Sequence, residues 1–283
     1  MKRIHISIIA LLCLIQVNAQ EQSGGLALYT LRAEMGDNPS ETLKEVAQDG
    51  YAYIEAAGYN EGKFYGMSPS DFKALLSSYN LIPVSSHQGG MTPENADQMI
   101  MDVKAAGFEY FVIPVPPMGM FKFDDKTMTM SMEGGAKKLA EILNDLGKKC
   151  HEQGLKLLYH NHDFEFKVDA QGLVPIEYLL EHCDAKYVNF QMDLFWVTKA
   201  GADPIAYFKK YPGRFKIWHV KDMNAEGWFA PVGQGSIDFG EILKHKKESG
   251  MLYYMVEQDQ CFELKPLDAI KISRKGLKKF GFQ

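Results

Sequence analysis

The sequence lacks long apolar runs, cysteine-rich segments and clusters of basic residues. The apolar run over residues 6–15 is about half as long as the roughly twenty residues that cross a bilayer. The chain has four cysteines, and the three that follow the first twenty residues are too scattered for a disulfide framework. A formal net charge of −5, without a Lys/Arg run, argues against nucleic acid as the main partner.

A glycine-rich phosphate loop is also missing. Residues 31–35, after the first predicted strand, read Leu-Arg-Ala-Glu-Met and contain no G-x-G-x-x-G pattern. That pattern is typical of doubly wound sheets that bind dinucleotides, so its absence weakens the open-sheet alternative. The sequence also contains no linker, low-complexity tract or second core, and we expect a single domain.

The first nineteen residues have the organisation of an export signal. Lys2 and Arg3 carry positive charge, residues 6–15 are apolar, and Ala19 is a small residue at a plausible cleavage position. We therefore expect residues 1–19 to be a cleaved signal peptide and residues 20–283 to form the mature domain. The protein is then predicted to be periplasmic or secreted, with no membrane span.

From Gly25 onward, apolar runs of strand character alternate eight times with helical patterns. The runs are residues 26–32, 51–59, 81–88, 108–116, 155–162, 187–197, 215–223 and 251–258. Helix starts are marked by Ser68-Pro69 and Thr92-Pro93, an N-cap followed by proline. Later helices are expected over residues 133–153, 175–182, 204–211, 239–249 and 267–280. This alternation predicts an α/β fold, a closed (β/α)8 TIM barrel.

Polar side chains gather where the predicted strands end, which is where TIM barrels carry their sites. His160 and His162 are two residues apart in a strand and therefore share a face. Buried charged groups are rare unless they are paired or bind a metal. The candidate residues are Glu55, His87, His160, His162, Glu165, Asp193, His219, Lys221, Glu257 and Asp259. Mixed oxygen and imidazole ligands favour Mn²⁺, Co²⁺, Zn²⁺ or Mg²⁺.

These motifs resemble the xylose isomerase-like, or sugar phosphate isomerase/epimerase, superfamily of TIM barrels. The resemblance covers nearly all of residues 20–283. Its specific segments are residues 159–166 (YHNHDFEF), 192–195 (MDLF), 218–222 (WHVKD), 233–238 (GQGSID) and 256–258 (VEQ). The resemblance implies one divalent metal ion held by Glu, Asp, His and Glu from strands five to eight. The last three positions fall on Asp193, His219 and Glu257.

The first ligand position departs from the family pattern. The family usually has Glu-Asn-His at the end of strand five, whereas this chain has His160-Asn161-His162. Either His160 takes the metal position, or Glu165 folds back to supply the carboxylate. We favour Glu165 because it keeps the ligand chemistry of the family, which leaves the histidines facing the substrate.

The resemblance implies a metal-dependent sugar isomerase or epimerase that removes a proton next to a carbonyl group. His162 or Glu257 is expected to move the proton, and Lys221 to hold a hydroxyl or oxyanion. The residues expected to contact the substrate are Glu55, His87, His160 and Trp196.

The predicted export and the lack of an Arg cluster favour a non-phosphorylated sugar or ketosugar as substrate. The same proton abstraction, followed by loss of a β-oxygen, would make the protein a lyase or dehydratase acting on a 3-keto sugar or 3-keto glycoside. A non-catalytic sugar-binding barrel is the second alternative.

Overall fold

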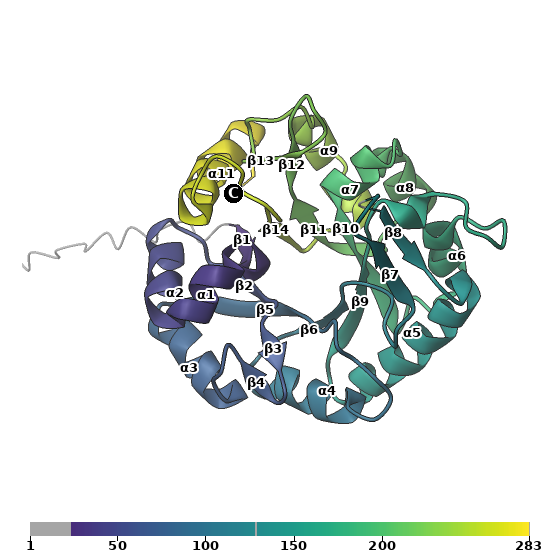
Figure 1. Cartoon of the computed structure of the whole chain (residues 1–283), viewed down its shortest axis with the longest axis horizontal. Coiled ribbons are helices and arrows are strands. Elements are labelled where there is room, and N and C mark those ends of the chain that lie inside the picture. Colours follow the sequence, from purple (N-terminus) through teal and green to yellow (C-terminus); the bar gives the residue numbers. More distant parts are fainter. Residues whose placement is uncertain (1–23, 128, 283) are drawn as a thin grey trace, which may run out of the picture.

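A computed structural model describes residues 24–127 and 129–282; the predicted signal peptide, residues 1–19, lies outside them. Eight parallel strands close into a barrel in the order β1-β14-β11-β10-β9-β6-β5-β2, surrounded by helices (Figure 1). The strands are β1 (Gly25–Ala27), β2 (Tyr53–Ala56), β5 (Ile82–His87), β6 (Tyr110–Ile113), β9 (Lys156–His160), β10 (Val188–Asp193), β11 (Phe215–Val220) and β14 (Tyr253–Val256). The TIM barrel is confirmed: seven of the barrel strands lie inside predicted runs, and β1 overlaps its run but begins one residue before it.

The strands are apolar throughout because both of their faces are buried. Alternate side chains point into the barrel, where a compact interior cluster fills its lower part. The cluster consists of Ala27, Val84, Tyr110, Val112, Leu158, Ile217 and Met255. The opposite faces pack against the helices in a larger outer core. The barrel interior is therefore filled by apolar side chains, and its polar side chains lie at the carboxyl ends of the strands.

Most helices follow the predicted pattern. The strand runs predicted over residues 26–32 and 187–197 were too long, because residues 28–31 and 194–199 are helical, and the helix predicted over residues 239–249 is divided in two. They are α1 (Arg32–Asp37), α2 (Pro39–Gln48), α3 (Pro69–Ser78), α4 (Ala96–Ala105), α5 (Gly135–Glu152), α6 (Pro175–His182), α7 (Leu194–Lys199), α8 (Pro204–Lys210), α9 (Phe239–Leu243), α10 (Lys246–Ser249) and α11 (Pro266–Phe280). Short 3₁₀ helices are η1 (Leu28–Leu31) and η2 (Phe164–Phe166). None of the helices in the described ranges has the length and apolarity of a membrane-spanning segment.

One predicted helix start is confirmed and another is wrong. The Ser68 side chain accepts the N–H of Asp71 and caps α3, as its sequence predicts. The Thr92-Pro93 start is not used, because α4 begins at Ala96. The Asn95 side chain accepts the Thr92 N–H at 2.7 Å, and the intervening residues form turns. Local side-chain bonding of this kind competes with the first turn of a helix.

Three short antiparallel hairpins in the loops were not predicted: β3 (Tyr59–Asn60) with β4 (Lys63–Phe64), β7 (Phe121–Asp124) with β8 (Thr129–Met132), and β12 (Asp222–Met223) with β13 (Phe229–Ala230). Strands of two to four residues leave no periodic signal in the sequence. The segment after β13 is tied to the barrel by Asp222, which is fully buried and accepts the N–H groups of Gly233, Gly235 and Ile237.

Replacing Gly276 with alanine is expected to destabilise the fold. A Cβ at Gly276 in α11 would lie 1.8 Å from the Val232 carbonyl oxygen, so the helix would have to move away from the loop. We expect a loss of about 1–3 kcal/mol in denaturant unfolding. Gly36→Ala in α1 is the control, because nothing lies within 4 Å of its Cβ and alanine favours helix. A Gly276→Ala protein as stable as Gly36→Ala would contradict this packing.

Candidate active site and metal centre

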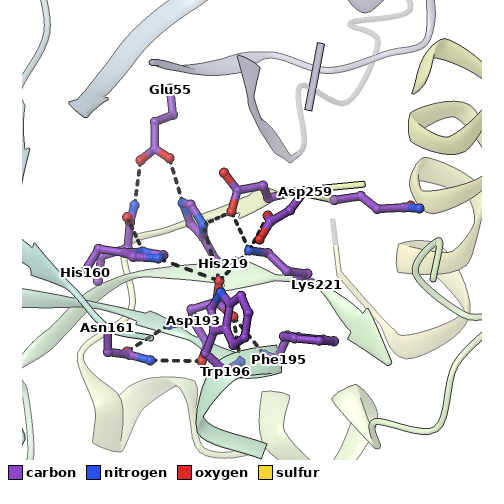
Figure 2. Close-up of polar contacts among 12 residues, drawn as sticks. Glu55, His160, Asn161, Asp193, Phe195, Trp196, His219, Lys221 and Asp259 are labelled. Carbon is purple, nitrogen blue, oxygen red and sulfur yellow. Dashed lines mark hydrogen bonds and ion pairs between the residues drawn. The ribbon is translucent and has the colours of Figure 1, made fainter. Parts of the chain in front are cut away.

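Charged side chains from four strands and the loops that follow them form one buried cluster above the apolar interior. Figure 2 shows Glu55, His219, Asp193, Lys221 and Asp259 converging on a small volume. Parallel pairing brings the strand ends to one level, with Asp193 opposite His219. The structure thus brings together Asp193, His219 and Glu257, three of the four residues predicted as metal ligands.

His219 lies between two carboxylates. Its Nε2 lies 2.6 Å from Glu55 Oε1, and its Nδ1 lies 3.0 Å from Glu257 Oε2. Burial alone would lower the pKa of His219, but these carboxylates raise it to about 10. Burial likewise acts to raise the pKa of Glu55, yet the His87 and His219 imidazoles hold it below its ordinary range. His219 is therefore oriented from both sides.

Gln191 sets the orientation of two more histidines. Its amide N–H group donates to Glu55 Oε2 at 2.6 Å, so its carbonyl oxygen faces His160 and His87. That oxygen lies 3.0 Å from His160 Nδ1 and 2.8 Å from His87 Nε2, and both ring nitrogens must therefore donate. His160 Nε2 is then left with a free lone pair, 3.9 Å from Asp193 Oδ2.

The two carboxylate oxygens of Asp193 have different partners. Its Oδ1 accepts the N–H groups of Phe195 and Trp196 and caps α7. Its Oδ2 is buried, and its contact is an ion pair with Lys221 Nζ at 3.0 Å rather than a well-aligned hydrogen bond. Asn161 bonds the main chain of Asp193 through both amide atoms and joins the β9 loop to the end of β10. The helix cap and Asn161 together aim Oδ2 into the cluster.

Lys221 is fully buried among three carboxylates. Its Nζ lies 3.0 Å from Asp193 Oδ2, 2.7 Å from Glu257 Oε2 and 2.6 Å from Asp259 Oδ1. Burial opposes a charged lysine, but these three groups raise the pKa of Lys221 well above its ordinary value. Burial raises the pKa of Asp259 to about 6, although Lys221 acts in the opposite direction.

The donor set fits a divalent cation. Four carboxyl groups, on Glu55, Asp193, Glu257 and Asp259, face one lysine and the histidines, so negative charge is in excess. Burial raises the pKa of Asp193, although Lys221 and His219 act in the opposite direction. Among the described residues, Glu55, His219 and Glu257 place ligand atoms within 4.8 Å of one another, as do His87, His160 and His219. Lys221 forms ion pairs with Asp193 Oδ2 and Glu257 Oε2, so an ion bound to these oxygens would share them with the lysine.

The structure does not bring Glu165 into this cluster, contrary to the prediction that it supplies the strand-five carboxylate. Its Oε1 accepts the Tyr159 hydroxyl at 2.7 Å, and its Oε2 accepts the His162 N–H at 2.8 Å. Tyr159 belongs to the outer core, on the opposite face of β9 from His160. The short η2 helix turns Glu165 to that side. His160, the last residue of β9, faces the cluster in place of Glu165, with its Nε2 3.9 Å from Asp193 Oδ2.

A cavity of about 270 Å³ opens over the cluster. Its chemically active lining residues are Tyr29, His87, His160, His162, Lys221, Glu257 and Asp259. His162 Nδ1 is buried without a partner among the described residues, and burial lowers the pKa of His162 to about 3. The predicted active residues His162, Lys221 and Glu257 therefore share one cavity.

Two residues predicted to contact substrate do not line this cavity. Glu55 lies beneath it and is fully buried, and both of its oxygens are used by His219, Ser85 and Gln191. Trp196 packs behind His162, with ring centroids 5.4 Å apart, and against Phe229. Glu55 therefore supports His219, and Trp196 supports His162, and neither side chain faces the cavity.

Tyr29 is a lining residue that the sequence did not indicate. It lies in η1 directly after β1, where the apolar run gave no polar signal. The sequence did point to Gln191 and Asn161 as site residues, because Gln191 lies two residues before Asp193 and Asn161 lies between His160 and His162. Their roles depend on partners 30 or more positions away, which sequence spacing does not reveal.

Comparison with known proteins agrees with this architecture. The family model described as "Xylose isomerase-like TIM barrel" matches residues 43–280. An inosose dehydratase of Clostridium beijerinckii is 31% identical over 168 residues, 52% of this chain and 55% of that protein. One from Bacillus thuringiensis is 31% identical over 143 residues, 43% and 47% of the two chains. The chain spans about half the length of these curated relatives.

Solved structures match over most of the chain. A sugar phosphate isomerase/epimerase of Parabacteroides distasonis has a TM-score of 0.76 at 25% identity, covering 91% of this chain and 98% of that one. An IolI protein with a bound zinc atom has a TM-score of 0.68 at 18% identity, covering 92% and 98%. This chain belongs to the xylose isomerase-like TIM barrel family.

Glu165→Gln is expected to flatten the dependence of stability on pH. Burial raises the pKa of Glu165 from its ordinary 4.5 to about 8, so the folded protein holds a proton that the unfolded chain has lost between these values. The stability contributed by this group is complete below pH 4.5 and is lost as the pH rises to about 8. Denaturant unfolding at about pH 5 and about pH 9 should show a larger loss for wild type than for the variant. Equal losses would contradict the burial of this carboxyl group.

Proposed function

We propose that this protein is a divalent-metal-dependent enzyme that removes the proton next to the carbonyl group of a non-phosphorylated keto sugar and then eliminates a β-oxygen. The observation that carries the proposal is the cavity over the buried cluster, which brings His162, Lys221, Glu257 and Asp259 together. The similarity to inosose dehydratases supports elimination as the outcome.

His160, Asp193, His219 and Glu257 are the proposed metal ligands. His160 Nε2 and His219 Nδ1 lie 3.9 Å and 3.8 Å from Asp193 Oδ2, so the three atoms surround one point. A bound ion would displace the proton that His219 Nδ1 shares with Glu257. The other ring nitrogen of each histidine is hydrogen-bonded: His160 Nδ1 to Gln191 and His219 Nε2 to Glu55. Metal-binding imidazoles usually have such a partner on the nitrogen that does not bind the metal. When bound, the ion supplies a Lewis acid for the carbonyl oxygen.

His162 and Asp259, the two groups proposed here to exchange protons with the substrate, lie on separate walls of the cavity. His162 follows β9, whereas Asp259 follows β14, and two strands stand between them in the barrel order. Burial lowers the pKa of His162 to about 3, so the ring is neutral over the physiological range, and its uptake of a proton would depend on Glu257, which acts to raise that pKa. Lys221 lines the cavity with its ammonium group held by Asp193, Glu257 and Asp259, so a substrate hydroxyl group would bind it by taking the place of one of these carboxylates.

A neutral substrate fits the lining. Among the described residues around the cavity, Lys221 is the one cation apart from the histidines, and no arginine takes part. Three carboxylates already neutralise this lysine. A phosphate group would therefore meet no free positive charge. The export predicted from residues 1–19 places the reaction outside the cytoplasm in this proposal, where sugar phosphates are scarce.

Isomerisation or epimerisation is the second candidate, because it begins with the same proton abstraction. The similarity to a sugar phosphate isomerase/epimerase at 25% identity over 91% of the chain favours it. His162 and Glu257 would then take and return the proton at neighbouring carbons, or on the two faces of one carbon.

Metal retention tests the ligand set. His160→Leu and Asp193→Asn are expected to weaken metal binding by at least about 100-fold. Asp193→Asn keeps the Oδ1 atom that caps α7, so a loss reflects Oδ2 and not unfolding. Glu165→Gln should keep the wild-type metal content after dialysis with Zn²⁺ or Co²⁺, measured by elemental analysis. Loss of metal in Glu165→Gln with retention in His160→Leu would restore Glu165 as the ligand.

Reaction in deuterated water separates the two candidate reactions. Elimination should give a product that has lost water or an alcohol, whereas isomerisation or epimerisation returns the full mass with deuterium incorporated. Both activities are expected to vanish with a chelator and to return with Mn²⁺ or Co²⁺. Sugar binding without turnover, unaffected by the chelator, would instead identify a binding module.

A further inference from the structure

A second cavity opens beside the first, at the seam where the barrel closes. It measures about 300 Å³ and is lined mainly by Thr30, Arg32, Glu34, Asp259, Gln260 and Cys261. Strands β1 and β14 pair at this seam, with Gly25 opposite Met255, so the loops that follow them are neighbours. This outer cavity is therefore built by the first and last βα loops of the chain.

The two cavities are neighbours that share one wall residue. Asp259 lines both of them. Tyr29 lines the inner cavity, and its ring is covered by the guanidinium of Arg32 at 4.6 Å, which lines the outer one. Arg32 also donates to the Tyr29 carbonyl oxygen at 3.0 Å. A ligand that occupied both cavities would have to pass Asp259 and the Tyr29–Arg32 pair.

The lining of the outer cavity suits the hydroxyl groups of a sugar. Arg32 and Gln260 offer N–H donors, and the carboxylate of Glu34 offers acceptors. Glu34 Oε2 is withdrawn from solvent and has no hydrogen-bond partner in the described residues. Such a group has a free-energy cost that a bound hydroxyl would remove.

A pair of exposed aromatic side chains begins one residue beyond the lining of the outer cavity. Phe262, directly after Cys261, is 60% exposed, and Trp228 is 47% exposed. Their rings meet edge to face with centroids 6.0 Å apart. Aromatic rings that remain half open to water offer a large apolar surface beside polar groups, the combination found in ligand pockets.

We propose that the outer cavity binds the leaving group of a glycoside, so that the natural substrate is a keto glycoside of two residues rather than a free keto sugar. This inference rests on the proposed elimination. The inner cavity alone lies at the lower limit of the roughly 300–1,000 Å³ typical of ligand sites, which leaves room for one ring. The glycosidic oxygen would then lie near Asp259, where the cavities meet.

The reaction needs no co-reactant. A base in the inner cavity takes the proton from the carbon next to the carbonyl, and the electron pair of that C–H bond forms a carbon–carbon double bond. The bond from the neighbouring carbon to the glycosidic oxygen breaks, and that oxygen takes up one proton. The products are an unsaturated keto sugar, which remains in the inner cavity, and a free alcohol, which leaves through the outer cavity.

Two substrates with the same keto ring test the proposal: a methyl 3-keto-glucoside and a 3-keto disaccharide. Wild type should prefer the disaccharide in kcat/KM. Arg32→Gln and Glu34→Gln should each lower the ratio of the two kcat/KM values by about 10-fold or more, mainly through the KM for the disaccharide. Glu61→Gln, in a separate cavity beside Tyr59 and Asp102, is the matched control and should leave both rates unchanged.

The outcomes separate this inference from the proposed function. Turnover of both substrates with an unchanged ratio in the variants would overturn the outer subsite and leave the elimination standing. Turnover of neither substrate would overturn the proposed function. Calorimetric titration of both compounds into wild type and Glu34→Gln then decides the subsite. Tighter binding of the disaccharide that is lost in the variant supports it, whereas equal affinities, or no binding, overturn it.

Discussion

Neutralisation of buried charge at the open end of the barrel is the constraint on which this site depends. Glu55, Asp193 and Glu257 are at most 5% exposed, and an unpaired charge at such depth costs several kcal/mol. Each carboxylate therefore lies against His219 or Lys221 at 2.6–3.0 Å. Because no one strand holds both partners of these pairs, the charges can be paired only in the closed barrel.

Two neutral amide side chains, Gln191 and Asn161, fix the orientation of the charged and imidazole groups of the site. Gln191 presents its carbonyl oxygen to two imidazoles, and Asn161 ties the β9 loop to the end of β10. The first turn of α7 holds one oxygen of Asp193 and directs the other toward the cluster, where it faces Lys221. Ligand atoms prepared in this way lose little freedom on binding, which is the usual basis of affinity in a metal centre.

Much of the fold was predictable because strands that are buried on both faces leave continuous apolar runs, and eight of them alternate with helices. The hairpins β3–β4 and β7–β8 could not be predicted, since their strands are too short to show a period. In the site, Asp193, His219, Lys221 and Glu257 followed from charge at strand ends. Glu165 was assigned by ligand type alone, and the turn in η2 directs it to Tyr159.

The sequence by itself determined the eightfold alternation of strand and helix, the end of the barrel that carries the polar groups, and the kind of ligand atoms gathered there. Tertiary structure alone decided that Glu55 supports His219 from below, that His160 and not Glu165 faces Asp193, and that a second cavity adjoins the first at Asp259. The physical reason is that strand periodicity fixes the face of a side chain, whereas its partners depend on which strands the closed barrel makes neighbours.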